Sequence, residues 1–458
     1  MAKMKKGEIA LWTAVAILLA LNIWLPRQMR HKYSWERDLS QRYAVDFDRT
    51  EKDVKNYIQE YIPDVTDAQI EDWTKSGKLE SMVIGKRRMY FHSAAPNLFR
   101  IVPELAALKA EKDSSSGLEG HQIIDSQTIP VIEKAVEDNL AAGKPDPYYA
   151  LPKRMRVTYR LTVPANTLRP GKHLRCWLPY PRSDVGRQTD VKFIEAGVNG
   201  VPYSKDKIIF SDPECAHGSL YMEAEAQRWK DVTFYEVFEY VSSGEWLPID
   251  SSKVLPYNTE SPEYKEYTAE REKHLIFTER IRRTADSLTA GIENPYLQAK
   301  AIYSWIDKTF PWASAREYST IENIPEYVLS SGHGDCGQVT LLFMTLCRAK
   351  GIPTRWQSGF MMHPGDKNLH DWCEAYFEGY GWVPVDQSFG VTPYGGYFFL
   401  GGIEPYRMIV NTDFGREMSP AKNYPRSETV DFQRGEVEWE QGNLYFNLWN
   451  YDYDIEYL

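Results

Sequence analysis

The stretch that decides the fold runs from Ser331 to Gly390 and contains three motifs: Gly332-His333-Gly334-Asp335-Cys336-Gly337-Gln338, His370-Asp371-Trp372-Cys373-Glu374 and Val383-Pro384-Val385-Asp386-Gln387. A cysteine, a histidine and an aspartate (Cys336, His370 and Asp386) therefore follow one another in that order. A thiol paired with an imidazole that a carboxylate orients is the usual arrangement for thiol-based acyl transfer. The stretch predicts a cysteine-based catalytic site.

Cys336 is expected in the first turn of a helix. Asp335 is a suitable N-cap, and apolar residues recur at helical spacing as far as Cys347. Gly351-Ile352-Pro353 then ends the pattern. The unpaired N–H groups and the dipole at a helix start favour a thiolate, which is the nucleophilic form of the side chain. Cys336 is therefore the predicted nucleophile, whereas Cys347 lies within the apolar stripe and is predicted to be core.

A β-hairpin is predicted to carry the other two residues. In residues 370–377 one set of side chains alternates with another, which is typical of a strand. The sets are His370, Trp372 and Glu374 on the one hand and Cys373, Ala375 and Phe377 on the other. Residues 378–381 supply a turn, and residues 382–386 have the composition of the returning strand. A hairpin of this length can bring Asp386 alongside His370, although the sequence leaves its register open.

These motifs resemble the transglutaminase-like superfamily, which has a papain-like cysteine fold. The resemblance rests on the Gly-Asp-Cys helix start, His-x-Trp-x-Glu on one strand and Val-Pro-Val-Asp on the next. It extends upstream to about Asn294 and includes Gly351-Ile352-Pro353-Thr354-Arg355 after the cysteine helix. Three ordered motifs at compatible spacings are far more specific than any one alone. The chain is similar to the membrane-anchored bacterial members of this superfamily.

The resemblance implies roles for the three residues. His370 takes the proton of Cys336 or shares an ion pair with it, and Asp386 holds the imidazole tautomer. The thiolate attacks an amide carbonyl, and the oxyanion meets the Cys336 backbone N–H plus one further donor. In this family an upstream aromatic or polar side chain can be that donor. Trp312 is the candidate here, with a core tryptophan as the alternative. No cofactor is expected.

Water or a lysine amine could resolve the resulting thioester. We expect hydrolysis of peptide or protein amides, because many bacterial members of the superfamily are thought to be hydrolases. The alternative is an amine-incorporating, cross-linking transglutaminase. A further alternative is a membrane-anchored binding scaffold without turnover, and the three intact residue types argue against it.

A zinc site is the competing interpretation of the same stretch. His333 with Cys336, and His370 with Cys373, have the spacing of two ligand pairs. If residues 370–377 form a strand, however, His370 and Cys373 point to opposite faces and cannot hold one ion. No metal is therefore expected.

The N-terminus is expected to anchor the chain in a membrane. The run from Ile9 to Leu25 is mostly apolar, with Trp12 and Trp24 near its ends. No small-x-small cleavage site follows, so an uncleaved anchor within residues 1–34 is favoured over a signal peptide. By analogy with other N-terminal anchors, the bulk of the chain is expected outside the cytoplasm, in the cell envelope. The flanking basic residues are similar in number on both sides and leave the orientation open.

The remaining chain is expected to form an α+β protein with several domains. Residues 35–150 are predicted to be a mixed helical module, 151–255 a β-sandwich-like domain, 256–415 the catalytic domain and 416–458 a C-terminal β extension. The net charge of −10 argues against nucleic acid as a partner. Five cysteines, an odd number, argue against a disulfide framework. The sequence does not define an oligomeric state.

Overall fold

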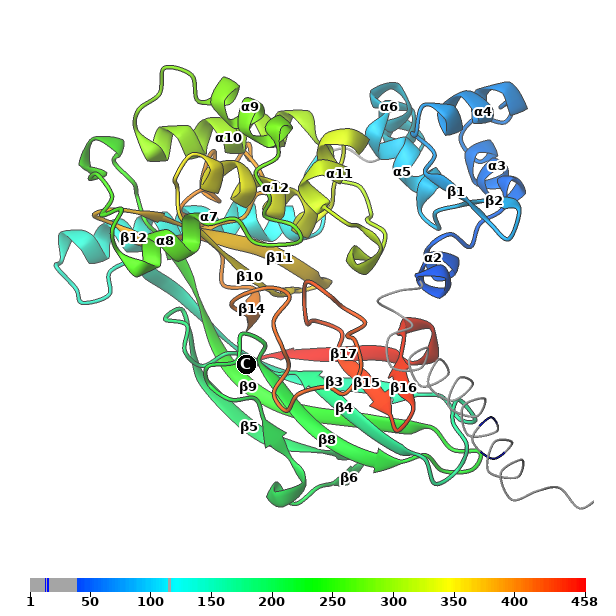
Figure 1. Cartoon of the computed structure of the whole chain (residues 1–458). Coiled ribbons are helices and arrows are strands. Elements are labelled where there is room, and N and C mark those ends of the chain that lie inside the picture. The colour runs from blue at the N-terminus through cyan, green and yellow to red at the C-terminus, as the bar shows by residue number, and fades with distance from the viewer. Residues whose placement is uncertain (1–12, 14, 16–38, 114–116) are drawn as a thin grey trace, which may run out of the picture.

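The computed structural model describes residues 13, 15, 39–113 and 117–458. The predicted membrane anchor at 9–25 falls outside these ranges, apart from residues 13 and 15, so it stays a prediction. Within the described ranges no helix combines the length and the apolar composition that a membrane crossing requires. The described chain is a mixed α/β fold (Figure 1).

A small helical module begins the described chain. Its elements are α2 (Ser40–Asp46), α3 (Glu51–Gln59), α4 (Asp67–Lys75), β1 (Ser81–Ile84), β2 (Arg87–Tyr90), α5 (Ala94–Ile101) and α6 (Pro103–Lys112). Thr50 and Thr66 start α3 and α4 through capping boxes, which satisfy the first N–H groups of each helix. The module buries its own apolar side chains, including Ile58, Phe91 and Leu98.

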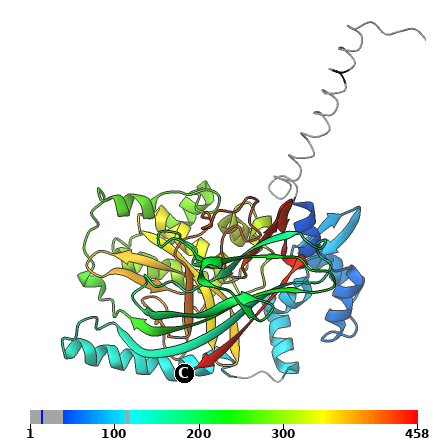
Figure 2. The same cartoon turned by 90° about the horizontal axis from the view of Figure 1, so that it is seen from below.

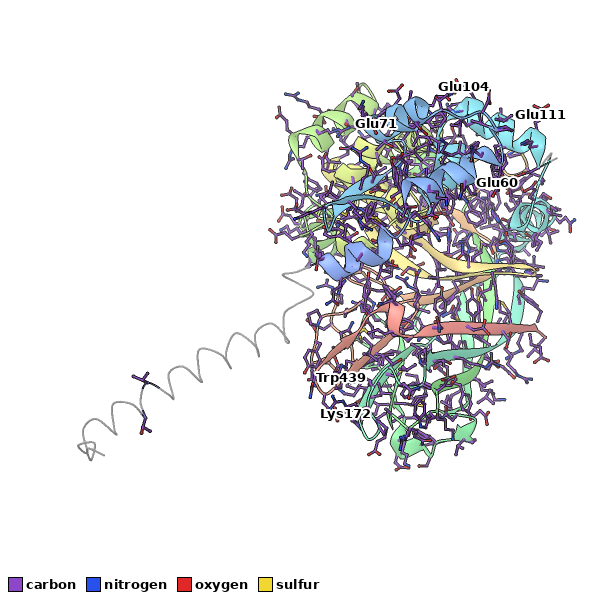
Figure 3. The ribbon with its side chains drawn as sticks, turned by 90° about the vertical axis from the view of Figure 1, so that its right-hand side faces the viewer. Glu60, Glu71, Glu104, Glu111, Lys172 and Trp439 are labelled. Atoms are coloured by element: carbon purple, nitrogen blue, oxygen red, sulfur yellow. The ribbon has the colours of Figure 1, made fainter. Side chains whose placement is uncertain are left out.

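This module lies at one side of the molecule in both ribbon views (Figure 1, Figure 2). Glu104 and Glu111 are exposed on α6, and Glu60 is exposed directly after α3 (Figure 3). Its inner side meets the main body, where Asn97 Nδ2 donates to the Ser314 carbonyl at 2.8 Å. The module therefore contacts the segment that leads towards Cys336.

Two antiparallel sheets form a sandwich in the lower part of Figure 1. The first has the order β17-β3-β9-β5-β6, with β13 paired to β9; the second has the order β16-β15-β4-β8-β7. Their bounds are β3 (Tyr149–Val163), β4 (His173–Pro179), β5 (Gln188–Val198), β6 (Val201–Pro202), β7 (Ile209–Phe210), β8 (Ser219–Glu225), β9 (Val232–Trp246), β13 (Gly402–Ile403), β15 (Glu436–Trp439), β16 (Gly442–Leu444) and β17 (Asn450–Tyr457). Side chains of both sheets share one core, with Tyr159, Trp177 and Phe238 at its centre. The C-terminal strands thus complete both sheets of the sandwich.

A third sheet, of order β12-β11-β10-β14, carries the histidine and leads into the aspartate motif. Its strands are β10 (Thr354–His363), β11 (Asp366–Phe377), β12 (Gly381–Val385) and β14 (Arg407–Asn411). Helices α8 (Pro262–Thr268), α9 (Glu279–Leu288), α10 (Pro295–Thr309), α11 (Ile324–Ser331) and α12 (Cys336–Ala349) form the helical half of this body (Figure 1). One face of the sheet, presenting Cys373, Ala375, Val383 and Val385, joins α12 in a single apolar core. This face is called the helix face below.

The opposite face of the same sheet presents Trp372, which packs with Ile403 and Ile409. Helix α7 (His121–Ala141) reaches the end of β10, where Asp125 meets His363 at 2.8 Å. Because side chains alternate along a strand, neighbouring residues of β11 are divided between this face and the helix face. The opposite face is called the arginine face below, since Arg407 is buried on it.

Candidate active site

Cys336 is the first residue of α12, as the sequence predicts. Asp335 is the N-cap: its carboxylate accepts from the Gln338 backbone N–H at 3.0 Å, and the Gln338 side chain accepts from the Asp335 N–H at 3.2 Å. This reciprocal capping box explains why the helix begins here. The capping box uses the Gln338 N–H, and the N–H of Cys336 itself lies at the helix start, where such groups can stabilise a developing oxyanion.

The predicted hairpin is also present and brings His370 and Asp386 together. Strands β11 and β12 pair antiparallel with Cys373 opposite Val385, which places Asp386 just beyond the end of β12. His370 Nε2 lies 2.7 Å from Asp386 Oδ2, and both side chains are buried. Alternation along the two strands is compatible with more than one register, and the structure shows which residues pair.

The third predicted contact, between Cys336 and His370, is not formed. The Cys336 thiol instead donates to Asp371 Oδ2 at 3.4 Å. His370 and Asp371 are adjacent in β11, so Asp371 points to the helix face and His370 to the arginine face. No hydrogen bond joins Cys336 to His370 in the part of the chain that the structure describes. The catalytic roles of His370 and Asp386 therefore stay predictions.

A cavity of ≈ 240 Å³ opens beside Cys336. Its lining includes Trp312, Tyr318, Asp371, Asp431 and Gln433. Trp312 is 45% exposed, so the alternative of a core tryptophan is wrong. Its backbone bridges Gly334, just before the helix. Trp312 thus lines the same cavity as Cys336, and its role as an oxyanion donor stays a prediction.

The carboxyl group of Asp371 is held from two sides. Gln433 Nε2 donates to Asp371 Oδ1 at 2.7 Å and to the His370 carbonyl at 3.0 Å. The Tyr318 hydroxyl lies 3.4 Å from Asp371 Oδ2 and donates to Asp335 Oδ1 at 2.6 Å. Neither Gln433 nor Tyr318 belongs to a motif that sequence reasoning singled out. The Asp in His370-Asp371-Trp372 was visible in the sequence, but only the packing of α12 shows which face it occupies.

The electrostatics of the helix face oppose a thiolate in the described arrangement. Burial raises the pKa of Cys336 well above its usual value, and the charges of Asp371 and Asp335 raise it further. These effects oppose the helix start, which favours a thiolate. Burial also raises the pKa of Asp371 well above its usual value, with Asp431 and Asp335 adding to the effect. The Cys336 thiol and the Asp371 carboxyl therefore both bind their protons more tightly than usual.

The arginine face has the opposite character. Burial raises the pKa of Asp386, but His370 and Arg407 more than offset it and bring it to about 2. Arg407 is fully buried and forms an ion pair with Asp386 at 2.9 Å and another with Glu404. Burial lowers the pKa of His370, and Asp386 opposes this only in part. His370 is therefore a neutral imidazole beside an ionised carboxylate.

The alternative zinc set is not assembled. Cys373 lies in the core on the helix face, whereas His370 faces the other way. Among the described residues, the group of His, Cys, Asp and Glu side chains close enough to hold an ion is Asp125, His363 and Glu404. Arg407 already pairs with Glu404, so a guanidinium occupies part of the space and charge that an ion would take.

The comparisons with known proteins agree with this architecture. Residues 282–387 match the family model of the transglutaminase-like superfamily, and they form the transglutaminase-like core of the fold. That match, with a cysteine at the helix start, supports a thiol-dependent enzyme. It leaves open whether the enzyme hydrolyses or cross-links.

Two curated relatives match part of the chain. The uncharacterized protein YebA of Bacillus subtilis is 26% identical over 132 residues, which cover 25% of this chain and 18% of that protein. An uncharacterized protein of Haemophilus influenzae is 24% identical over 163 residues, covering 30% of this chain and 42% of that protein. The chain thus spans less than half the length of these curated relatives.

Two solved structures are similar at low levels. One, from Cytophaga hutchinsonii and provisionally named a cysteine protease, gives a TM-score of 0.44 at 14% identity, covering 68% of this chain and 92% of that one. The periplasmic domain of TgpA from Pseudomonas aeruginosa gives 0.28 at 15% identity, covering 54% and 91%. Neither value is high enough to carry an argument about the site.

Proposed function

We propose that the chain is a cysteine hydrolase that cleaves amide bonds in peptides or proteins through Cys336. One observation carries the proposal: the Cys336 thiol is the first side chain of α12 and borders a cavity, within the segment that matches the transglutaminase-like family. A thiol at a helix start faces several unpaired backbone N–H groups, which can stabilise an oxyanion. The cavity is smaller than the roughly 300–1,000 Å³ of a pocket for a drug-sized ligand, so it accepts a group the size of a side chain.

The proposed reaction has two steps. The Cys336 sulfur attacks the amide carbonyl carbon, the C–N bond breaks, the amine leaves with one proton, and a thioester remains. Water then attacks the thioester carbonyl, the C–S bond breaks, and the carboxylic acid leaves while a proton returns to the sulfur. The Cys336 N–H stabilises the oxyanion in both steps, and Trp312 is the proposed second donor.

The acid–base assignment from the resemblance is His370 oriented by Asp386. The support is the His370–Asp386 contact of 2.7 Å and the neutral imidazole. The assignment needs the imidazole to reach the sulfur, a contact that the described arrangement lacks. It therefore rests on the resemblance and is tested separately from the nucleophile.

We also propose a setting for the reaction. The apolar run from Ile9 to Leu25 supports a membrane-anchored enzyme whose described part lies in the cell envelope. Its substrates there would be peptides or proteins, and its net charge of −10 argues against nucleic acid. Fractionation of cells, with protease added from outside, tests both the anchor and its orientation.

Mass spectrometry on the purified full-length chain tests the reaction. The chain is incubated with a peptide mixture, with and without a lysine-like amine. We expect peptides cut at an amide bond with the mass of water gained, and no such products from Cys336→Ser. Incorporation of the amine without cleavage would show a cross-linking enzyme. If neither product forms from any peptide, the result would favour the alternative of a binding scaffold without turnover.

A further inference from the structure

The cavity beside Cys336 is lined by more carboxyl groups than cations. Its carboxyl side chains come from the loop before α11, the start of α12, strand β11 and the segment before β15. The acidic residues of the lining are Glu317, Asp335, Asp371, Glu428 and Asp431, and the basic ones are Arg316 and Arg434.

Both arginines of the lining already have carboxylate partners. Arg434 pairs with Glu317 and with Glu428 at 2.7 Å each. Arg316 lies 3.5 Å from Glu80, which is outside the lining. The carboxyl groups of the lining that form no ion pair with any described residue are therefore those of Asp335, Asp371 and Asp431.

Asp431 is the member of this group whose polar atoms are least satisfied. It is 6% exposed, and its Oδ1 atom is buried without a hydrogen-bond partner among the described residues. Arg426 donates to the backbone carbonyl of Asp431. Burial and the charges of Glu428 and Asp335 raise the pKa of Asp431 to about 8, and a hydrogen bond with Ser358 opposes this only in part. A buried polar atom without a partner costs free energy that a donor on a ligand can recover.

Asp371 is fixed within the same lining. Gln433 Nε2 donates to Asp371 Oδ1 at 2.7 Å, and Asp371 Oδ2 lies 3.4 Å from the Cys336 sulfur. A Cβ on Gly337 would lie 2.5 Å from Asp371 Oδ2 and closer still to the Tyr318 hydroxyl, so the glycine leaves the space that these two side chains fill. A buried carboxyl group is therefore held directly beside the thiol.

We infer that this cavity binds a positively charged side chain, that of lysine or arginine, next to the amide bond that Cys336 attacks. The inference rests on the proposed function and names its substrate class, which is peptides with a cationic residue beside the cleaved bond. The ammonium or guanidinium group donates to Asp431, and Asp371 adds a second negative charge. The acid–base assignment to His370 is unchanged.

A cation in this cavity changes the protonation of the groups around it. A carboxyl that holds its proton in the empty cavity gives the proton to water when a cation arrives, because an opposite charge nearby favours the ionised form. A cation beside Cys336 also favours its thiolate, which is the nucleophile. Binding of the cationic substrate thus makes the thiol more reactive.

Two thiol reagents of opposite charge test the cavity without any turnover. Aminoethyl methanethiosulfonate carries an ammonium group, and sulfonatoethyl methanethiosulfonate carries a sulfonate. Their rates at Cys336 at neutral pH, measured by peptide mapping, are each divided by the rate with a small free thiol. We expect the ammonium reagent to be favoured about tenfold, the size of one hydrogen bond to a charged group. Asp431→Asn should remove most of this preference, and Asp64→Asn, at an exposed position of the helical module, should keep it.

No preference in the unmodified chain, or a preference for the sulfonate, would overturn the inference. This comparison needs no variant, so it decides the matter even if Asp431→Asn does not fold. A full preference in a folded Asp431→Asn would overturn the binding mode, because the cation would then have another partner.

Matched peptides test whether the cation belongs to the substrate. A bond that is cut in the peptide mixture is placed in peptides that carry Lys, Arg, norleucine, Gln or Glu at each position next to it in turn. We expect kcat/KM to be about tenfold higher for Lys and Arg than for norleucine, and lowest for Glu. A higher value for Gln than for Lys would show a subsite for a neutral amide and overturn the inference. Equal values would overturn it as well and, with the reagent preference present, would show a site for a free amine.

The two experiments distinguish this inference from the proposed function. Preference for the ammonium reagent without turnover of any peptide would support the cation site and overturn the proposed function. Turnover without any preference for cations would overturn only this inference.

Discussion

Two residues that are neighbours in sequence, His370 and Asp371, belong to two different environments. On the arginine face, His370 contacts Asp386, which pairs with Arg407, and Arg407 also pairs with Glu404. On the helix face, Asp371 contacts a thiol and lies near Asp335 and Asp431, with no cation of its own among the described residues. Removing one partner of a buried ion pair leaves an uncompensated charge and is costly, and strongly shifted pKa values are concentrated at functional sites. The two faces thus place a buried thiol beside a carboxyl with a raised pKa, and an imidazole with a lowered pKa beside a carboxylate whose pKa is about 2.

The largest expected effect follows a change of the proposed nucleophile, Cys336, whose thiol contacts the helix face at Asp371. Cys336→Ala should abolish amide turnover, with a loss of about 10⁴-fold or more, since no other group can form the thioester. Folding should survive, because the side chain is half-buried and the change is small. A mass-spectrometric turnover assay and a melting curve check this together. Residual turnover near the normal rate, with an unchanged Tm, would move the site away from Cys336.

The next effect concerns stability on the arginine face. Arg407→Met should lower the free energy of unfolding by about 3–5 kcal/mol, because it leaves Asp386 and Glu404 buried without their cation. Arg407→Lys, which keeps the charge, should cost less. Urea unfolding followed by circular dichroism measures both. If Arg407→Met is as stable as the unmodified chain, the ion pairs on this face contribute nothing, and the contrast between the faces disappears.

His370→Ala separates the two faces directly. We expect it to lower stability by about 2 kcal/mol, through loss of a buried charge-assisted hydrogen bond to Asp386. Its turnover, measured at a temperature well below its Tm, should fall about 10²–10⁴-fold, because the proposed acid–base assignment needs the imidazole, and unchanged turnover would contradict that assignment. A loss of this size would show that His370 reaches the sulfur during the reaction. Asp386→Asn should then lose part of the turnover as well, because it removes orientation but no reacting atom.

The two faces should also respond to pH with opposite signs. The folded pKa of Asp386, about 2, lies below the unfolded value of about 3.9. Its stabilising effect is therefore complete above pH 4 and is lost as the pH falls towards 2, by roughly 2–3 kcal/mol. Burial and Glu428 raise the folded pKa of Asp431 to about 8, so its contribution is lost as the pH rises from about 4 to 8.

Melting curves at a series of pH values check this contrast. Asp431→Asn should flatten the decline of Tm between pH 4 and 8, and Asp386→Asn should flatten the decline below pH 4. Asp64→Asn, at an exposed position between α3 and α4, is the control and should leave both slopes unchanged. If Asp431→Asn steepens the decline above pH 4, the Asp431 carboxyl is ionised in the folded chain and a cation balances the charge on the helix face.

The smallest expected effect is the pattern of thiol labelling. Cys176, Cys347 and Cys373 are fully buried, whereas Cys215 and Cys336 are half-buried. Brief iodoacetamide treatment should therefore modify Cys215 and Cys336 before the other three. Peptide mapping shows the order. Modification of Cys347 or Cys373 first would mean that the core around α12 opens readily.

Local signals made part of the site predictable. The start of α12 follows from Asp335 and Gln338, which cap the helix within four residues of one another. The β11–β12 hairpin follows from a short turn between two alternating segments. Both depend on neighbours along the chain, so the sequence contains the information that defines them.

The groups that decide the chemistry come from distant parts of the chain. Gln433 and Arg407 reach β11 from later segments, and no motif marks either one. Alternation along β11 was visible in the sequence, but the face that α12 covers depends on packing between elements that are not adjacent. The expected Cys336–His370 contact assumed the other face. The cavity and the arginine face could therefore be found only in the folded chain.

The close packing around Gly337 predicts which residues occur together at positions 337 and 371 in related sequences. A Cβ at position 337 would lie 2.5 Å from Asp371 Oδ2 and closer still to the Tyr318 hydroxyl, so a substitution there requires one of these side chains to move. Descendants of one ancestor should therefore carry Gly at 337 together with Asp at 371, or have exchanged both. A survey of homologous sequences can count these combinations, and frequent Asp371 beside a bulky residue 337 would contradict the expectation. The residue after Cys336 and the residue after His370 would then distinguish groups of related chains that share the ordered cysteine, histidine and aspartate.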